Sequence, residues 1–140
     1  LSLFVWARRI RKLAMPLAGD IEPLMPRNIS EIASAVPLAV NAGLSEEVFF
    51  RLALPLLAGQ VTGSALAGFA IACAAFALVH WYQGRKGMLV VFAVGVWLSW
   101  MYLATGSLLK PILVHILIDL IALVVRPAIA LQLRRRASAA

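Results

Sequence analysis

Six ionisable side chains lie inside segments that are otherwise apolar. They are Glu46, Glu47, Arg51, His80, His115 and Asp119. Carboxyl and imidazole groups are the side chains that enzymes use most often to take up and deliver protons. Because a charge is costly inside a membrane, ionisable residues at such depth are candidates for a functional site.

The first three of these residues are close in sequence, and helical spacing divides them. Glu47 and Arg51 are four positions apart with the carboxylate on the N-terminal side, which favours an ion pair along one helix face. Glu46 lies about 100° further around the helix, so it is left without a local partner. The alternative is that all three residues form one ion cluster that locks a kinked helix.

The histidines lie in two further apolar stretches. His80 ends FALVH (76–80), where Phe76 shares its helix face; an isolated histidine there also fits a satisfied core residue. His115 and Asp119 share a face in HILID (115–119). This second pair can be a metal ligand set, a proton relay or a mutually satisfied polar pair.

The composition indicates what positions these groups. Of 140 residues, 63% are hydrophobic and 14% charged, whereas a soluble domain has about 45–50% apolar and about 25% charged residues. We therefore predict an all-α, polytopic membrane bundle of about four spans. In the broken first span, Gly43 would end one helical piece and Ser45 would cap the next. The expected helical segments are 29–42 with 46–58, then 64–82, 88–104 and 108–131.

The net charge of +7 is concentrated at the ends of the apolar segments, in RRIRK (8–12), RK (85–86) and RRR (134–136). This pattern is typical of cytoplasmic flanks that face anionic lipid. We expect an integral protein of a bacterial inner (cytoplasmic) membrane with its basic loops in the cytoplasm and the lipid bilayer as a partner. Nucleic-acid binding is not expected, because no basic surface interleaved with aromatic residues is visible.

Three regions follow from this pattern. Residues 1–28 are expected to be a basic N-terminal segment and loop, which can include the end of an upstream span. Residues 29–131 form the membrane domain, and 132–140 form a basic tail. The single cysteine, Cys73, excludes an intrachain disulfide.

Depth along the helices can be estimated from a rise of about 1.5 Å per residue. On this scale Glu46 and Asp119 each lie about 20 Å from the neighbouring outer turn, His115 about 14 Å and His80 about 30 Å. We expect these four residues to converge in the inner half of the membrane.

Four short motifs occur in order: EEVFFR (46–51), FALVH (76–80), FAVG (92–95) and HILID (115–119). They match the pattern EExxxR, FxxxH, FxxG and HxxxN or HxxxD. Over residues 40–122 the chain thus resembles the CPBP intramembrane proteases, the CAAX-protease and bacteriocin-processing family. It departs at Leu52, where the family often has glycine, and at Asp119, where the prenyl-protease branch has asparagine.

The resemblance implies an intramembrane endopeptidase whose substrate is a membrane-associated peptide or protein, lipidated near its C-terminus in the prenyl branch. Glu46 and His80 would activate water, while His115 and Asp119 would hold the oxyanion or help to bind the substrate. The supporting residues that the motifs imply are Glu47 and Arg51, which position the site, and Phe76, Phe92 and Gly95, which shape its cavity.

Two chemical questions stay open at this point. A carboxylate accepts hydrogen bonds, so Asp119 either donates in a neutral form or orients His115. The residues do not require a metal, since HExxH is absent; if zinc takes part, its candidate ligands are Glu46, His80 and His115, with one open position.

Two other functions use the same residues. The short chain, Leu52 and Asp119 also fit a non-catalytic accessory or binding subunit of a larger membrane complex. A small transporter or proton relay is a third interpretation.

Overall fold

The structure is a computed structural model that describes residues 25–138. In this range every regular element is a helix, which agrees with the predicted all-α class. The elements are α2 (Ile29–Glu47), η2 (Val48–Ala53), α3 (Leu54–Thr62), α4 (Ala65–Val79), η3 (Trp81–Gln83), α5 (Gly84–Thr105), α6 (Leu109–Leu120), η4 (Ile121–Val125) and α7 (Arg126–Ser138). Most of the predicted N-terminal segment lies outside the described residues.

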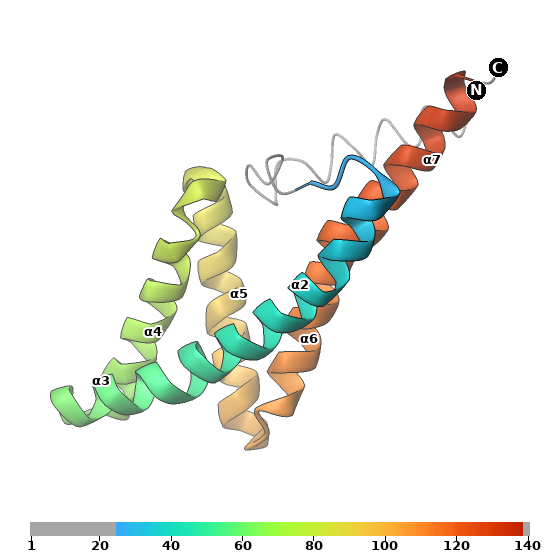
Figure 1. Cartoon of the computed structure of the whole chain (residues 1–140). Coiled ribbons are helices and arrows are strands. Elements are labelled where there is room, and N and C mark those ends of the chain that lie inside the picture. Colours follow the sequence, from blue (N-terminus) through green and yellow to red (C-terminus); the bar gives the residue numbers. More distant parts are fainter. Residues whose placement is uncertain (1–24, 139–140) are drawn as a thin grey trace.

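The helices form two groups joined by one long helical run (Figure 1). α2, η2 and α3 follow one another without a loop, and α3 packs against α4 while α2 packs against α6. α5 returns beside α4 and also contacts α6. The C-terminal end of α2 therefore lies where the α4–α5 hairpin and the α6–α7 run approach each other.

The predicted break of the first span at residues 41–45 is wrong. α2 continues through this segment to Glu47. Gly43 does not end the helix but is buried against Ile116 of α6, where a side chain would not fit. Ser45 does not act as a cap either, since its hydroxyl donates to the carbonyl of Asn41 within the same helix, at 2.7 Å.

Two irregular turns of the described chain, η2 and η4, are π-helical and lie further along the chain, and η3 is a 3-10 helix. In η2 the N–H of Leu54 donates to the carbonyl of Phe49, five residues back instead of four. η4 shows the same widening. Each π turn is followed two residues later by a proline, Pro55 or Pro127, which cannot supply the N–H that a regular α-helix needs. Such turns are frequent at functional sites.

Burial in this structure is inverted relative to a soluble protein. Arg51 and Glu47 are among the largest fully buried side chains, whereas apolar residues such as Leu66 and Trp100 are 81% and 63% exposed. A large exposed apolar surface marks contact with lipid or a partner. The arrangement fits a molecule whose surroundings are apolar and whose polar groups meet inside.

Two helical stretches of the described chain are long and apolar enough to cross a membrane. They are Trp81–Thr105, with 25 residues, and Leu109–Ala137, with 29. α4 is also apolar but shorter. These helices support membrane insertion, and the number of four spans stays a prediction, as do the domain boundaries.

Gly43→Ala is expected to destabilise the protein by about 1–3 kcal/mol, the range typical of overpacking. The new Cβ would lie 2.5 Å from Cγ1 of Ile116 and 2.9 Å from its backbone nitrogen, so α2 and α6 would have to separate. The measurement is reversible unfolding in detergent. Gly59→Ala is the matched control, because its Cβ would meet no atom closer than 3.6 Å; equal stability of the two variants would contradict the close contact.

Candidate active site

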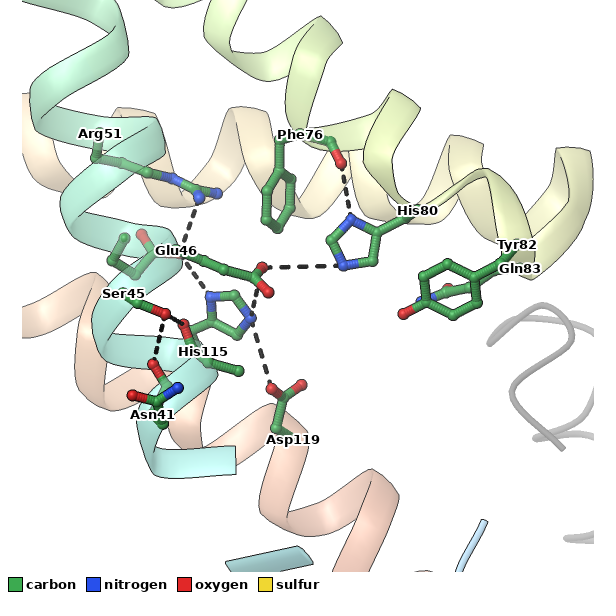
Figure 2. A network of polar contacts seen from close by, with 12 residues as sticks. Asn41, Ser45, Glu46, Arg51, Phe76, His80, Tyr82, Gln83, His115 and Asp119 are labelled. Carbon is green, nitrogen blue, oxygen red and sulfur yellow. Dashed lines mark hydrogen bonds and ion pairs between the residues drawn. The ribbon is translucent and has the colours of Figure 1, made fainter. Parts of the chain in front are cut away.

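The four predicted catalytic residues lie in one cluster where α2, α4 and α6 meet (Figure 2). Oε2 of Glu46 is 3.9 Å from Nε2 of His80 and 4.0 Å from Nε2 of His115. The same Nε2 atom of His115 lies 3.7 Å from Oδ2 of Asp119. Residues from three separate motifs are thus within reach of one small molecule.

Glu47 and Arg51 lie together as their spacing predicts, with NH1 of Arg51 2.8 Å from Oε1 of Glu47. The same carboxylate oxygen accepts a hydrogen bond from Nδ1 of His115 at 2.6 Å. Both members of the ion pair are buried, at 0% and 1% side-chain exposure. Glu47 therefore links the cation of η2 to the imidazole of α6.

The guanidinium of Arg51 is stabilised mainly by charge and by an aromatic ring. Its central carbon lies 4.3 Å from the centroid of Phe76, a cation–π distance. In the described part of the chain none of its three nitrogens makes an aligned hydrogen bond, although NH1 is close to Glu47. The contact with Glu47 is therefore an ion pair more than a directed hydrogen bond.

Gly95 of α5 leaves room for this stack. A Cβ at this position would lie 2.9 Å from Cδ1 of Phe76 and 3.7 Å from NH2 of Arg51. Phe76 also contacts both imidazoles, with ring centroids 4.8 Å from His80 and 5.9 Å from His115. Of the residues expected to shape the cavity, Phe76 and Gly95 therefore lie at the cluster.

Phe92, the third of those residues, lies differently. It is 42% exposed on α5. Within residues 25–138 no aromatic or polar contact joins it to the cluster. Its expected role in shaping the cavity thus stays a prediction.

His80 is the residue that ends α4, and its own turn fixes its ring. Nδ1 lies 2.7 Å from the carbonyl oxygen of Phe76, so this nitrogen donates its hydrogen there. In the neutral ring, Nε2 is then the free acceptor, and it faces Glu46 (Figure 2). The structure thus sets the tautomer that a proton-accepting His80 requires.

His115 is held by Glu47 at Nδ1, which leaves Nε2 directed at Glu46 and Asp119. Asp119 was expected either to donate a hydrogen bond in a neutral form or to orient His115. The short contact that orients the ring comes from Glu47, and Asp119 lies at the opposite, open nitrogen. Asp119 is 25% exposed, so it borders the accessible side of the cluster.

The two neighbouring glutamates differ sharply in accessibility. Glu46 retains 32% side-chain exposure, whereas Glu47 has none. A base that acts on water must be reachable by water. Glu46 is therefore the more exposed of the two, although its Oε2 atom, which faces both histidines, is itself buried, whereas Glu47 is enclosed completely.

Two features of the site were not predicted. The contact of Glu47 with His115 joins residues 68 positions apart, and no sequence signal indicates it. Tyr82 lies beside His80, with ring centroids 5.8 Å apart. The sequence signal that could have indicated this contact is the position of Tyr82, two residues after the histidine of FxxxH.

The charged side chains of the cluster are also possible metal ligands. The described residues contain no group of three or more His, Cys, Asp or Glu side chains arranged to hold a metal ion. Nδ1 of His115 is engaged by Glu47 and Nδ1 of His80 by a backbone carbonyl, which leaves the Nε2 atom of each histidine free on the side of Glu46. Zinc held by Glu46, His80 and His115 therefore stays a prediction.

Fold and site together define a helical protein with an apolar exterior and a buried carboxylate–imidazole centre. In comparison with protein families, the chain matches the type II CAAX prenyl endopeptidase Rce1-like family over residues 28–121. The match covers well over half of the chain, so the chain belongs to this family, which confirms the resemblance. No curated protein and no solved structure matches the chain.

Proposed function

We propose that this protein is an intramembrane endopeptidase that hydrolyses a peptide bond in a membrane-associated or lipidated substrate. The observation that carries the proposal is the Oε2 atom of Glu46, which is buried without a hydrogen-bond partner among the described residues and faces the Nε2 atoms of His80 and His115 at 3.9 and 4.0 Å. Family membership supports the class of reaction, and the exposed apolar helices support a membrane location.

Water activation would take place between Glu46 and His80. Two acceptors 3.9 Å apart can both be reached by the hydrogens of one water molecule, since each hydrogen bond is about 2.8 Å long. Glu46 removes one proton while the water oxygen attacks the carbonyl carbon of the peptide bond. Glu46 then gives that proton to the leaving amine as the carbon–nitrogen bond breaks, and the second water proton stays on the new carboxyl group.

The developing oxyanion needs a donor, and His115 is placed to supply one. Its Nδ1–H is directed at Glu47, so donation from Nε2 requires the doubly protonated ring. Carboxylates near both ring nitrogens, Glu47 and Asp119, stabilise that charged form. In this proposal Asp119 supports the imidazolium and need not itself donate.

The substrate would reach the cluster from the membrane. The basic ends of the chain are expected to face the cytoplasm of a bacterial cell, with the bilayer as the main partner. Lys and Arg side chains at these ends would hold the protein against anionic lipid.

Purified protein in liposomes is expected to cleave a fluorogenic peptide that ends in a farnesylated CAAX sequence, and to cleave it equally well in a zinc chelator. The chain's own carboxylate and imidazoles supply the base, the acid and the donor, so metal removal should cost less than twofold in rate. The same peptide without its lipid is the control for substrate class.

Two results would contradict this proposal. Activity that the chelator removes and zinc restores would show that the reaction uses a metal. Absence of cleavage for all peptides, together with co-purification in a larger complex at fixed stoichiometry, would favour the accessory subunit.

A further inference from the structure

A short turn after His80 places an unassigned tyrosine at the edge of the cluster. Tyr82 lies in η3, and its ring is inclined by 32° to the ring of His80, with centroids 5.8 Å apart. The phenol lies alongside the imidazole, and its hydroxyl is directed toward the side on which Glu46 and Asp119 lie (Figure 2).

The backbone fixes this placement. The N–H of Gln83 donates to the carbonyl of His80 at 3.0 Å, and the N–H of Gly84 donates to the carbonyl of Trp81. Gly84 has φ +72, a conformation that favours glycine and turns the chain into α5. Tyr82 therefore belongs to the same rigid turn as the catalytic candidate His80.

The hydroxyl of Tyr82 has a hydrogen free to donate. Nε2 of Gln83 donates to this oxygen at 3.2 Å, which uses the phenol as an acceptor. A tyrosine hydroxyl carries one donor in addition to its acceptor sites. With 52% of the residue exposed, that donor is accessible to a bound molecule.

The cluster itself has many acceptors and few accessible donors. Glu46, Asp119 and the free nitrogen of His80 all accept hydrogen bonds. The guanidinium of Arg51 is a donor, but it is buried at 1% side-chain exposure. A peptide presents a carbonyl acceptor at every residue, so binding it in an extended form requires donors on the protein. Tyr82 supplies one next to the reacting groups.

We propose that Tyr82 binds substrate, its hydroxyl donating a hydrogen bond to a backbone carbonyl of the peptide next to the scissile bond. This inference rests on the proposed endopeptidase function. The competing role is an interfacial anchor, together with the exposed Trp81, for which the aromatic ring alone is enough.

Tyr82→Phe separates these roles, because it keeps the ring and removes the hydroxyl. We expect kcat/KM to fall about tenfold, near the upper end of what one hydrogen bond contributes. The loss should appear in KM with kcat within about twofold, since a bond to a non-reacting carbonyl is made equally in the ground state and the transition state. The thermal unfolding temperature in detergent should not change.

Tyr102→Phe is the matched control. Tyr102 lies near the other end of α5, where it packs against Phe69 with centroids 6.3 Å apart. Its loss of a hydroxyl should leave both kinetic constants unchanged. Unchanged kinetics in Tyr82→Phe, a loss confined to kcat, or an equal loss in both variants would overturn the proposal.

Binding without turnover distinguishes this proposal from the function on which it rests. The farnesylated peptide is titrated against Glu46→Gln and against Glu46→Gln/Tyr82→Phe, with an expected tenfold weaker Kd in the second. If the parent cleaves nothing but this difference appears, the endopeptidase function fails and the role of Tyr82 stands. Equal affinities overturn the role of Tyr82, and absence of binding to both variants overturns both proposals.

Discussion

Glu46→Gln is expected to lower the rate of peptide hydrolysis by about a hundredfold to ten-thousandfold while the fold stays intact. General base catalysis typically contributes about 10²–10⁴-fold. The carboxamide keeps the shape of the side chain but cannot accept a proton from water or pass it to the leaving amine. The measurement is single-turnover cleavage of the farnesylated peptide in liposomes.

Little stability should be lost in this variant. Glu46 is 32% exposed, and its contacts with both imidazoles are no shorter than 3.9 Å. The Oε2 atom that faces the imidazoles is buried but accepts no hydrogen bond from a described residue, so the carboxamide breaks none. An active Glu46→Gln protein would remove Glu46 from the mechanism.

The adjacent residue provides the contrast. Glu47→Gln leaves the proposed base, Glu46, in place but removes the negative charge that Arg51 and His115 both contact. It should therefore lose stability as well as activity. If Glu46→Gln loses activity alone and Glu47→Gln loses both activity and stability, the first residue is the reacting group and the second positions the site.

Local spacing was sufficient to predict which of the two glutamates pairs with Arg51. Four positions separate Glu47 from Arg51, and this alone predicts the ion pair that the structure shows. The motifs also indicated which residues should converge. What spacing cannot provide is the rotation of one helix against another, so the short bond from His115 to Glu47 could not be predicted.

The place where the first helix becomes irregular was predicted wrongly for a physical reason. Gly43 and Ser45 suggested a break, but a buried glycine is needed there for the close approach to Ile116. Pro55 and Pro127 were better indicators of where the helices become irregular. Pro55 follows Glu47 by eight positions, and Pro127 follows Asp119 by the same interval, with a π turn between the members of each pair.

The depth estimate treated the helices as straight and parallel. On that basis His80 lay about 10 Å deeper than Glu46, yet their side chains face each other at 3.9 Å. The α2–α3 run is inclined to α4 (Figure 1), and the side chains at the C-terminal ends of α2 and α4 meet. The angle between two helices depends on how they pack, and the rise per residue along one helix carries no information about it.

Arg51→Met is expected to destabilise the protein by about 3–5 kcal/mol, the usual cost of removing one partner of a buried ion pair. The methionine fills much of the same volume, but Glu47 would remain at 0% exposure without its cation. The contact with the Phe76 ring would also lose its charge. The free energy of unfolding in mixed detergent micelles is the measurement, with the exposed Arg85→Met as the control for loss of a positive charge.

The double variant Glu47→Gln/Arg51→Met tests the cause of that loss. If an uncompensated carboxylate is responsible, removing its charge should restore part of the stability, so the two changes will not be additive. The double variant should nevertheless stay inactive, because His115 has lost the carboxylate that holds its Nδ1. A double variant as unstable as the sum of the single changes would mean that Glu47 and Arg51 act independently, and the buried pair would then not be what makes the site stable in an apolar surrounding.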